Sequence, residues 1–147
     1  MSELARKTQN SKSWREAIQR LKHNVKFNAP ADAENIRDIE TSLRTNVPLD
    51  LRDLLLETNG IEDWLLSAKN IIDVNLEYRN RKEYQEVYMP LDGLLFFLQD
   101  GTGSYYGYPI CGGRCDTVPR VFYWLHETDE RTVAGDTLAA VLERYLR

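Results

Sequence analysis

The sequence predicts an α+β fold in which N-terminal helices and a C-terminal helix pack around a central, mainly antiparallel β-sheet. Apolar residues recur at helical spacing early in the chain and again at its C-terminus. Between these regions lie two continuous apolar runs, Leu94–Leu98 and Val121–Leu125, which are typical of buried strands. Helices first, strands later and a helix at the end indicate separate helical and sheet segments rather than alternating βαβ units.

The composition predicts one soluble domain over residues 13–147, preceded by a flexible tail at residues 1–12. No run approaches the roughly 18 apolar residues of a membrane helix, and Met1–Ser13 lacks the apolar stretch of a signal peptide. We therefore expect a cytoplasmic protein without a membrane partner. The net charge of −4 argues against direct nucleic-acid binding and is compatible with a basic protein partner.

Three helices are predicted before residue 60. The first spans Ser13–His23, and the second begins near Asp32, whose side chain can cap the free N–H groups of the first turn. The third runs over Leu49–Thr58 and stops at Asn59-Gly60, where Gly60 is expected in the left-handed C′ position. The predicted buried faces are, in order, Trp14, Ala17, Ile18, Leu21 and Val25; Ile36, Ile39 and Leu43; and Leu51, Leu54 and Leu55.

The middle of the chain is predicted to hold one more helix. Residues 61–66 are expected to form a short strand or extended segment with Trp64 partly exposed. The segment from Ser67 to about Lys82 carries Ile71, Asn75 and Tyr78 on one face, which predicts a helix. The segment 84–91 is predicted to be a loop that leads into the sheet.

The sheet is predicted from the two apolar runs, which read as strands buried on both faces, with two or three adjacent antiparallel strands in total. Asp100-Gly101 between them is a strong turn signal. Alternation along a strand puts Tyr106 and Tyr108 on one face and Tyr105 on the other, so at least one tyrosine is expected to reach solvent. A charged, turn-rich stretch follows Leu125, and the last helix begins near residues 135–137.

No complete catalytic or metal-binding pattern is present in the sequence. Ser104 follows glycines but lacks the G-x-S-x-G spacing of a nucleophile elbow, and the glycines around it miss the dinucleotide-binding spacing. His126-Glu127 has no evident third partner for acid–base work. Cys111 and Cys115 supply only half of a zinc site. We therefore expect no enzyme activity, no cofactor and no metal, and structural roles for Glu40 and Trp124.

The order of elements and the residues at their joints resemble the SUKH superfamily, which includes the fungal Smi/Knr regulator of cell-wall synthesis and many bacterial immunity proteins. The resemblance covers residues 13–147. In one departure, Gly103 is followed by Ser104 where the family often has Asp. The matching residues are Trp14; Ile36, Ile39, Glu40 and Leu43; Pro48, Leu51, Leu54, Leu55, Asn59 and Gly60; Asp100, Gly101, Thr102 and Gly103; and Val121, Trp124, His126 and Glu127.

The resemblance implies a non-enzymatic domain that binds and neutralises a cognate secreted toxin, often a nuclease and so possessing a basic surface. The alternatives are a cytoplasmic regulatory or scaffold module of the Smi/Knr type and, third, a small-ligand domain or enzyme that uses the Tyr-Gly-rich loop. No oligomeric state is predicted. The residues expected at the partner-binding surface are Asp63, Trp64, Asp100, Tyr105, Tyr106, Tyr108, Arg114 and Glu127.

Overall fold

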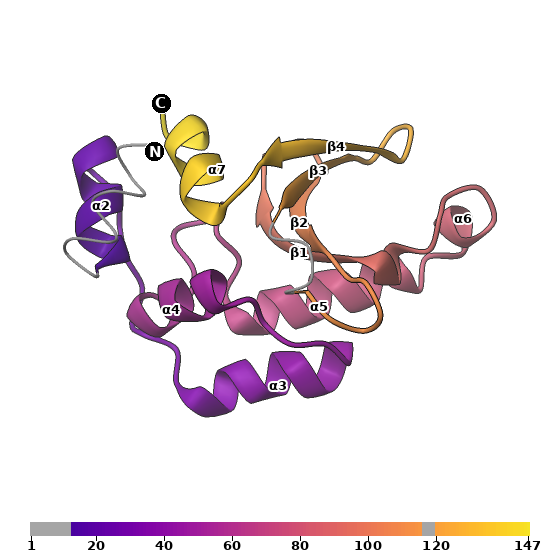
Figure 1. Cartoon of the computed structure of the whole chain (residues 1–147), viewed down its shortest axis with the longest axis horizontal. Helices are drawn as coiled ribbons and strands as arrows, with labels where there is room; N and C mark the ends of the chain where they lie inside the picture. Colours follow the sequence, from indigo (N-terminus) through magenta and orange to yellow (C-terminus); the bar gives the residue numbers. More distant parts are fainter. Residues whose placement is uncertain (1–12, 116–119) are drawn as a thin grey trace.

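The computed structural model describes residues 13–115 and 120–147 (Figure 1). The predicted tail at residues 1–12 lies outside this part of the chain. The described residues form helices around one four-stranded sheet. In chain order the elements are α2 (Trp14–Leu21), α3 (Ala33–Leu43), α4 (Leu49–Glu57), α5 (Ala68–Arg79), α6 (Lys82–Gln85), the 3-10 helix η1 (Leu91–Gly93), β1 (Leu94–Gln99), β2 (Tyr105–Pro109), β3 (Val121–Leu125), β4 (Glu130–Gly135) and α7 (Leu138–Tyr145).

The strands lie in the order β1-β2-β3-β4, and each neighbouring pair is antiparallel. This arrangement confirms the predicted α+β class. The turn from Asp100 to Ser104 joins β1 to β2, and both Gly101 and Gly103 have positive φ, 86° and 101°. Asp100-Gly101 therefore belongs to the turn that sets the register of the first hairpin, in which Gln99 pairs with Tyr105.

Side-chain caps fix where four of the helices begin. The hydroxyl or carboxylate of the cap accepts a hydrogen bond from the backbone N–H three residues later at Ser13, Asp32, Ser67 and Thr137. These bonds satisfy donors that have no partner inside the helix. The predicted cap at Asp32 is confirmed. Glu40 has the structural role expected for it, because its carboxylate accepts the backbone N–H of Val47 at 2.8 Å.

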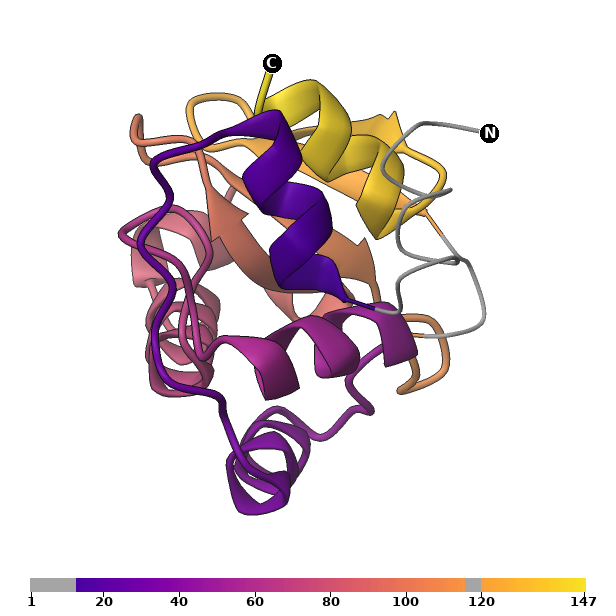
Figure 2. The same cartoon turned by 90° about the vertical axis from the view of Figure 1, so that its left-hand side faces the viewer.

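Helices cover the sheet in layers. Helix α5 packs against β1, and α3 packs against α5 on the side away from the sheet (Figure 1). Figure 2 shows α2 and α7 next to each other with α4 below them, in front of the sheet. The core between these layers contains fully buried Trp124, as predicted, together with Phe96, Phe97 and Leu142.

The outer edge of β1 is closed by side-chain and backbone contacts. The buried Asn75 side chain of α5 accepts the Phe96 backbone N–H at 2.9 Å and donates to the Phe96 carbonyl at 2.9 Å. Residues 64–66 continue the closure, because Leu66 N–H donates to the Phe97 carbonyl and Gln99 N–H donates to the Trp64 carbonyl. Asn75 thus pairs with β1 as a neighbouring strand would.

Gly60 holds the tight turn after α4. Its φ is +86°, and a Cβ there would lie 2.9 Å from both the Leu65 carbonyl oxygen and the Ser67 backbone nitrogen. The left-handed conformation is as predicted, but the cap of α4 is Thr58, so Gly60 is one residue beyond the expected C′ position.

Several predictions differ from the structure. Trp64 is buried, with 5% of its surface exposed, because it packs against Tyr145 of α7. Residues 61–66 form a turn with isolated bridges, and residues 84–91 include the end of α6. Strand β3 is not buried throughout, since Phe122, Tyr123 and Leu125 are only half-buried. Strand β4 was not predicted, because its exposed, polar sequence lacks an apolar alternation.

Candidate functional site

Two hairpin turns meet at one end of the sheet, which we call the turn end: Asp100–Ser104 between β1 and β2, and His126–Asp129 between β3 and β4. The Ser104 hydroxyl oxygen accepts the His126 backbone N–H at 3.0 Å and lies 2.7 Å from His126 Nδ1. No sequence pattern predicts this pair, since 22 residues separate its members. Ser104 is fully buried, and a nucleophile must reach its substrate. The geometry therefore assigns the pair to joining the two turns.

The Asp100 carboxylate accepts several hydrogen bonds within and beside the first turn. It accepts hydrogen bonds from the Tyr123 hydroxyl at 2.5 Å and from the Thr102 hydroxyl at 2.7 Å. Burial acts to raise the pKa of Asp100, but these bonds and backbone N–H groups together favour the carboxylate, so the pKa lies below its usual value. Asp100 is thus a fixed negative charge that also orients Tyr123.

A groove lined by three tyrosines lies between the sheet and α7, and we call it the tyrosine groove: Tyr106, Tyr123 and Tyr145. It encloses about 210 Å³, with Ala134, Val141 and Arg144 completing its walls. The Tyr106 ring centroid lies 5.1 Å from that of Tyr123 and 5.8 Å from that of Tyr145. All three rings are only half-buried. Because the phenols already pack on one another, their faces and edges are presented to solvent in fixed positions.

Tyr145 links the groove to the acidic residues predicted at the site. Its hydroxyl donates to the Gln99 carbonyl at 2.8 Å. Burial raises the pKa of Tyr145 to about 12, and the negative charges of Asp100 and Asp63 add to this. Asp100 is tied to the groove by its bond to Tyr123, and exposed Asp63 directly precedes Trp64, whose ring packs on Tyr145.

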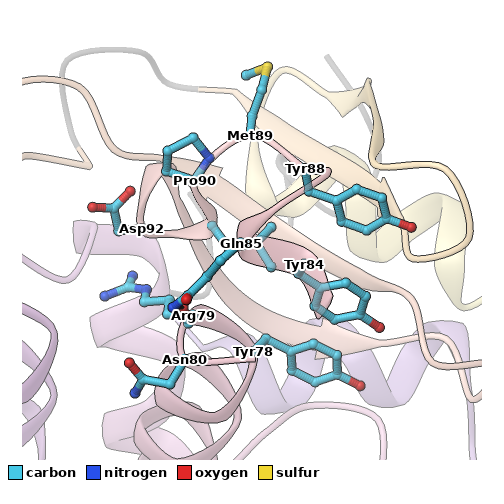
Figure 3. Close-up of a pocket in the computed structure, with 10 residues that line it drawn as sticks. Tyr78, Arg79, Asn80, Tyr84, Gln85, Tyr88, Met89, Pro90 and Asp92 are labelled. Atoms are coloured by element: carbon cyan, nitrogen blue, oxygen red, sulfur yellow. Dashed lines mark hydrogen bonds between the residues drawn. The ribbon is translucent and has the colours of Figure 1, made fainter. Parts of the chain in front are cut away.

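The segment 80–93, between α5 and β1, lies on the other face of the sheet, and we call it the arm. It carries a stack of aromatic rings. Its Tyr84 ring stacks between those of Tyr78 and Tyr88, with centroid distances of 5.8 and 4.9 Å and interplanar angles of 6° and 8° (Figure 3). Trp124 of β3 meets all three rings edge-on. The Arg81 guanidinium lies 4.3 Å from the centre of the Tyr78 ring.

Beside this stack the arm forms a pocket of about 420 Å³, the arm pocket. Figure 3 shows Arg79, Asn80 and Asp92 on the side away from the tyrosine hydroxyls, with Met89 and Pro90 above them. The Arg79 guanidinium donates to the carbonyls of Leu43 and Leu94, and burial lowers its pKa. Arg79 therefore ties α3 and β1 together at the pocket wall. The lining residues are Tyr78, Arg79, Asn80, Tyr84, Gln85, Tyr88, Met89, Pro90, Leu91 and Asp92.

Five of the eight residues predicted for the partner surface lie at the turn end of the sheet. Asp63, Trp64, Asp100 and Tyr106 come together at or beneath the tyrosine groove, and exposed Glu127 lies in the second turn of the same sheet end. Of these, Trp64 is buried.

Three further predicted residues lie elsewhere. Tyr105 is 7% exposed and packs edge-on against Tyr78, within the core. Tyr108 is 5% exposed and stacks on Phe97, at the far end of β2. Arg114 is exposed in the turn that begins at Cys111. The expectation that one tyrosine of this cluster reaches solvent is confirmed for Tyr106 alone.

Sequence reasoning missed Tyr123 and Tyr145 in the groove and Tyr84 and Tyr88 in the arm. Tyr123 stands within an apolar run, and Tyr145 follows Leu138, Val141 and Leu142 at helical spacing, so both residues look like core positions in the sequence. The spacing of Tyr84 and Tyr88, four residues apart, is a signal that a helical turn would place both rings together. In the described residues, no group of three or more His, Cys, Asp or Glu side chains could hold a metal ion.

The fold and these surfaces define a small α+β domain with rigid aromatic and acidic features gathered at one end of its sheet. A family model described as the SMI1 / KNR4 family (SUKH-1) matches residues 30–144, and the chain belongs to this family. The predicted superfamily is thereby confirmed. A search of curated proteins found no match. Among the helices of residues 13–115 and 120–147, none is both long and apolar enough to cross a membrane.

Proposed function

We propose that this chain is a non-enzymatic binding protein of the immunity type, which occupies and neutralises a cognate toxin in the cytoplasm. The observation that carries the proposal is the tyrosine groove with Asp63 and Asp100 beside it. Tyrosines with few rotatable bonds and fixed orientation are favoured interface anchors, because little side-chain entropy is lost on binding. Tyr123 and Tyr145 are held by hydrogen bonds to Asp100 and Gln99.

The carboxylates beside the groove favour a partner with basic side chains, and the one arginine named in its wall, Arg144, is bonded to the Ala134 carbonyl. Lysine and arginine pair with exposed carboxylates and stack on tyrosine faces. A toxin that cleaves nucleic acid needs such a basic surface to bind phosphates. An acidic inhibitor that covers it blocks the substrate and gains from electrostatic steering during association.

The proposal predicts that a neighbouring gene encodes a large secreted protein with a C-terminal toxin domain, and co-expression with that domain is the test. The wild-type chain should restore growth and co-purify with the toxin. A folded double variant, Asp63→Lys with Tyr106→Ala, should lose both properties, whereas Glu34→Lys on the exposed face of α3 should retain them. No rescue and no co-purification by the wild-type chain would contradict the immunity role.

The regulatory alternative stays open because the same family model includes the Smi/Knr type. It predicts a different result, since the chain should capture an endogenous cytoplasmic protein from lysate without any toxin gene nearby. Capture that depends on Tyr106 and Asp63 would place that partner in the same groove.

A further inference from the structure

The arm presents two large apolar side chains to solvent. Val87 is 73% exposed and Met89 is 62% exposed, although they flank Tyr88, whose ring is packed in the stack. Single exposed apolar residues are ordinary on a protein surface, but these two stand only two positions apart in one segment, and we call them the apolar patch. Met89 itself lines the arm pocket together with Pro90 and Leu91.

The backbone that carries these side chains is firmly anchored. The Tyr88 hydroxyl donates to the His126 carbonyl at 2.6 Å, and Met89 N–H donates to an Asp129 carboxylate oxygen at 2.9 Å. The Met89 carbonyl accepts from the Arg131 guanidinium at 2.9 Å. Asp129 is held in turn by Arg131 and by the Trp124 indole N–H. Because both polar backbone groups of Met89 are bonded, the backbone that carries its exposed side chain is fixed in place.

The surroundings of the patch are acidic. The arm and the adjacent β3–β4 turn, residues 80–93 and 126–131, contain six carboxylates and three basic side chains. This gives the region a net charge of −3, most of the −4 of the whole chain. Two of the bases are engaged, since Arg81 pairs with Glu77 and Arg131 with Asp129. Four carboxylates form no ion pair within the described residues: Glu86, Asp92, Glu127 and Glu130.

We propose that the arm face, formed by Val87, Met89, the arm pocket and the carboxylates of Glu86, Asp92 and Glu127, is a second contact surface for the same toxin. It would bind a basic segment that carries one apolar residue. The apolar side chain enters the arm pocket beside Met89, and flanking lysines or arginines pair with the carboxylates. The inference rests on the proposed function, because the partner that it names, the toxin, is the partner of the proposed function.

The acidic charge of the arm face favours a basic protein segment over a second copy of the chain, nucleic acid or lipid. A second copy of the chain would bring the same acidic face, and like charges at an interface are repelled. Nucleic acid and anionic lipid are disfavoured for the same reason. A basic protein segment satisfies both the apolar and the acidic part of the surface.

The test uses the purified, inactivated toxin domain that the neighbouring genes are predicted to encode. Its dissociation constant is measured by calorimetry at about 0.05 M and about 0.3 M salt. The double variant Val87→Ser/Met89→Ser should weaken binding at least about tenfold. Glu86→Lys/Glu127→Lys should weaken it too and make affinity less sensitive to salt. The matched controls are Leu49→Ser, which removes an apolar side chain 67% exposed on α4, and Glu34→Lys on α3.

The outcomes separate the two proposals. If the wild-type chain binds and both arm variants bind as it does, the arm face is wrong while the proposed function stands. If the wild-type chain does not bind the toxin at all, the proposed function fails and the arm loses its partner. Self-association of the wild-type chain that Val87→Ser/Met89→Ser abolishes would assign the arm to a dimer and overturn the inference.

Discussion

The Asn75 side chain is predicted to contribute several kcal/mol to the free energy of unfolding, because it bonds the edge of β1 where a neighbouring strand would otherwise do so. Its amide is 1% exposed and bonds both the N–H and the carbonyl of Phe96. Asn75→Ala leaves these two buried backbone groups without partners. An orphaned buried polar group costs about 1–3 kcal/mol, so the expected loss in the free energy of unfolding is about 2–6 kcal/mol. This is a large share of the roughly 5–15 kcal/mol that stabilises a typical domain.

The assay is urea unfolding followed by circular dichroism, together with hydrogen exchange at the Phe96 amide. The unfolding midpoint should fall with little change in slope, and the Phe96 N–H should lose protection. Asn80→Ala is the matched control, because Asn80 follows the same helix and donates to the carbonyl four residues earlier, Leu76, but is exposed. Equal losses for the two variants, with the Phe96 N–H still protected, would show that Asn75 does not close the edge of β1.

Three further predictions concern single positions. Gly60→Ala should lower the free energy of unfolding by about 1–3 kcal/mol through backbone strain alone, and by more because the new Cβ would approach residues 65–67 closely. Gly101→Ala is the control for strain alone, because Gly101 has the same φ of 86° but open space around it. Equal melting temperatures for the two variants would argue against the close approach. Leu142→Asp buries a carboxylate at a fully buried position of α7 and should abolish cooperative melting, and an unchanged melt would disprove the docking of α7. The pKa of Asp100 is lowered in the folded state, so the stabilisation by its carboxylate is present above the unfolded pKa of about 3.9 and is lost as the pH falls through the folded-state pKa. The difference in unfolding free energy between the wild-type chain and Tyr123→Phe should therefore shrink in acid titrations. A constant difference would show that the charge of Asp100 is not the source of that stabilisation.

The burial at the turn end explains why only part of the surface was predictable. Alternation correctly separates Tyr105 from Tyr106, because neighbouring side chains in a strand point to opposite faces. Which of those faces is covered depends on α5 and α7, which come from distant parts of the chain. Tyr105 is covered by Tyr78 of α5, and Tyr106 remains half-exposed at the edge of α7.

Four features were predictable from the amino-acid sequence: the α+β class, the buried faces of the helices, the cap at Asp32 and the first hairpin turn. These features depend on local chemistry: apolar spacing, a side chain that caps its own helix, and glycines that accept positive φ. The family resemblance followed from the same residues, in order along the chain.

The position of the candidate binding surfaces depends instead on contacts between distant parts of the chain. Strand β4 forms because β3 offers it a partner, although its own sequence has no strand pattern. Ser104 meets His126, Asp100 meets Tyr123, and the arm is fixed to Asp129, each across more than twenty residues of sequence. Contacts of this kind arise from how strands and helices pack together, and no short-range pattern of residue types encodes them.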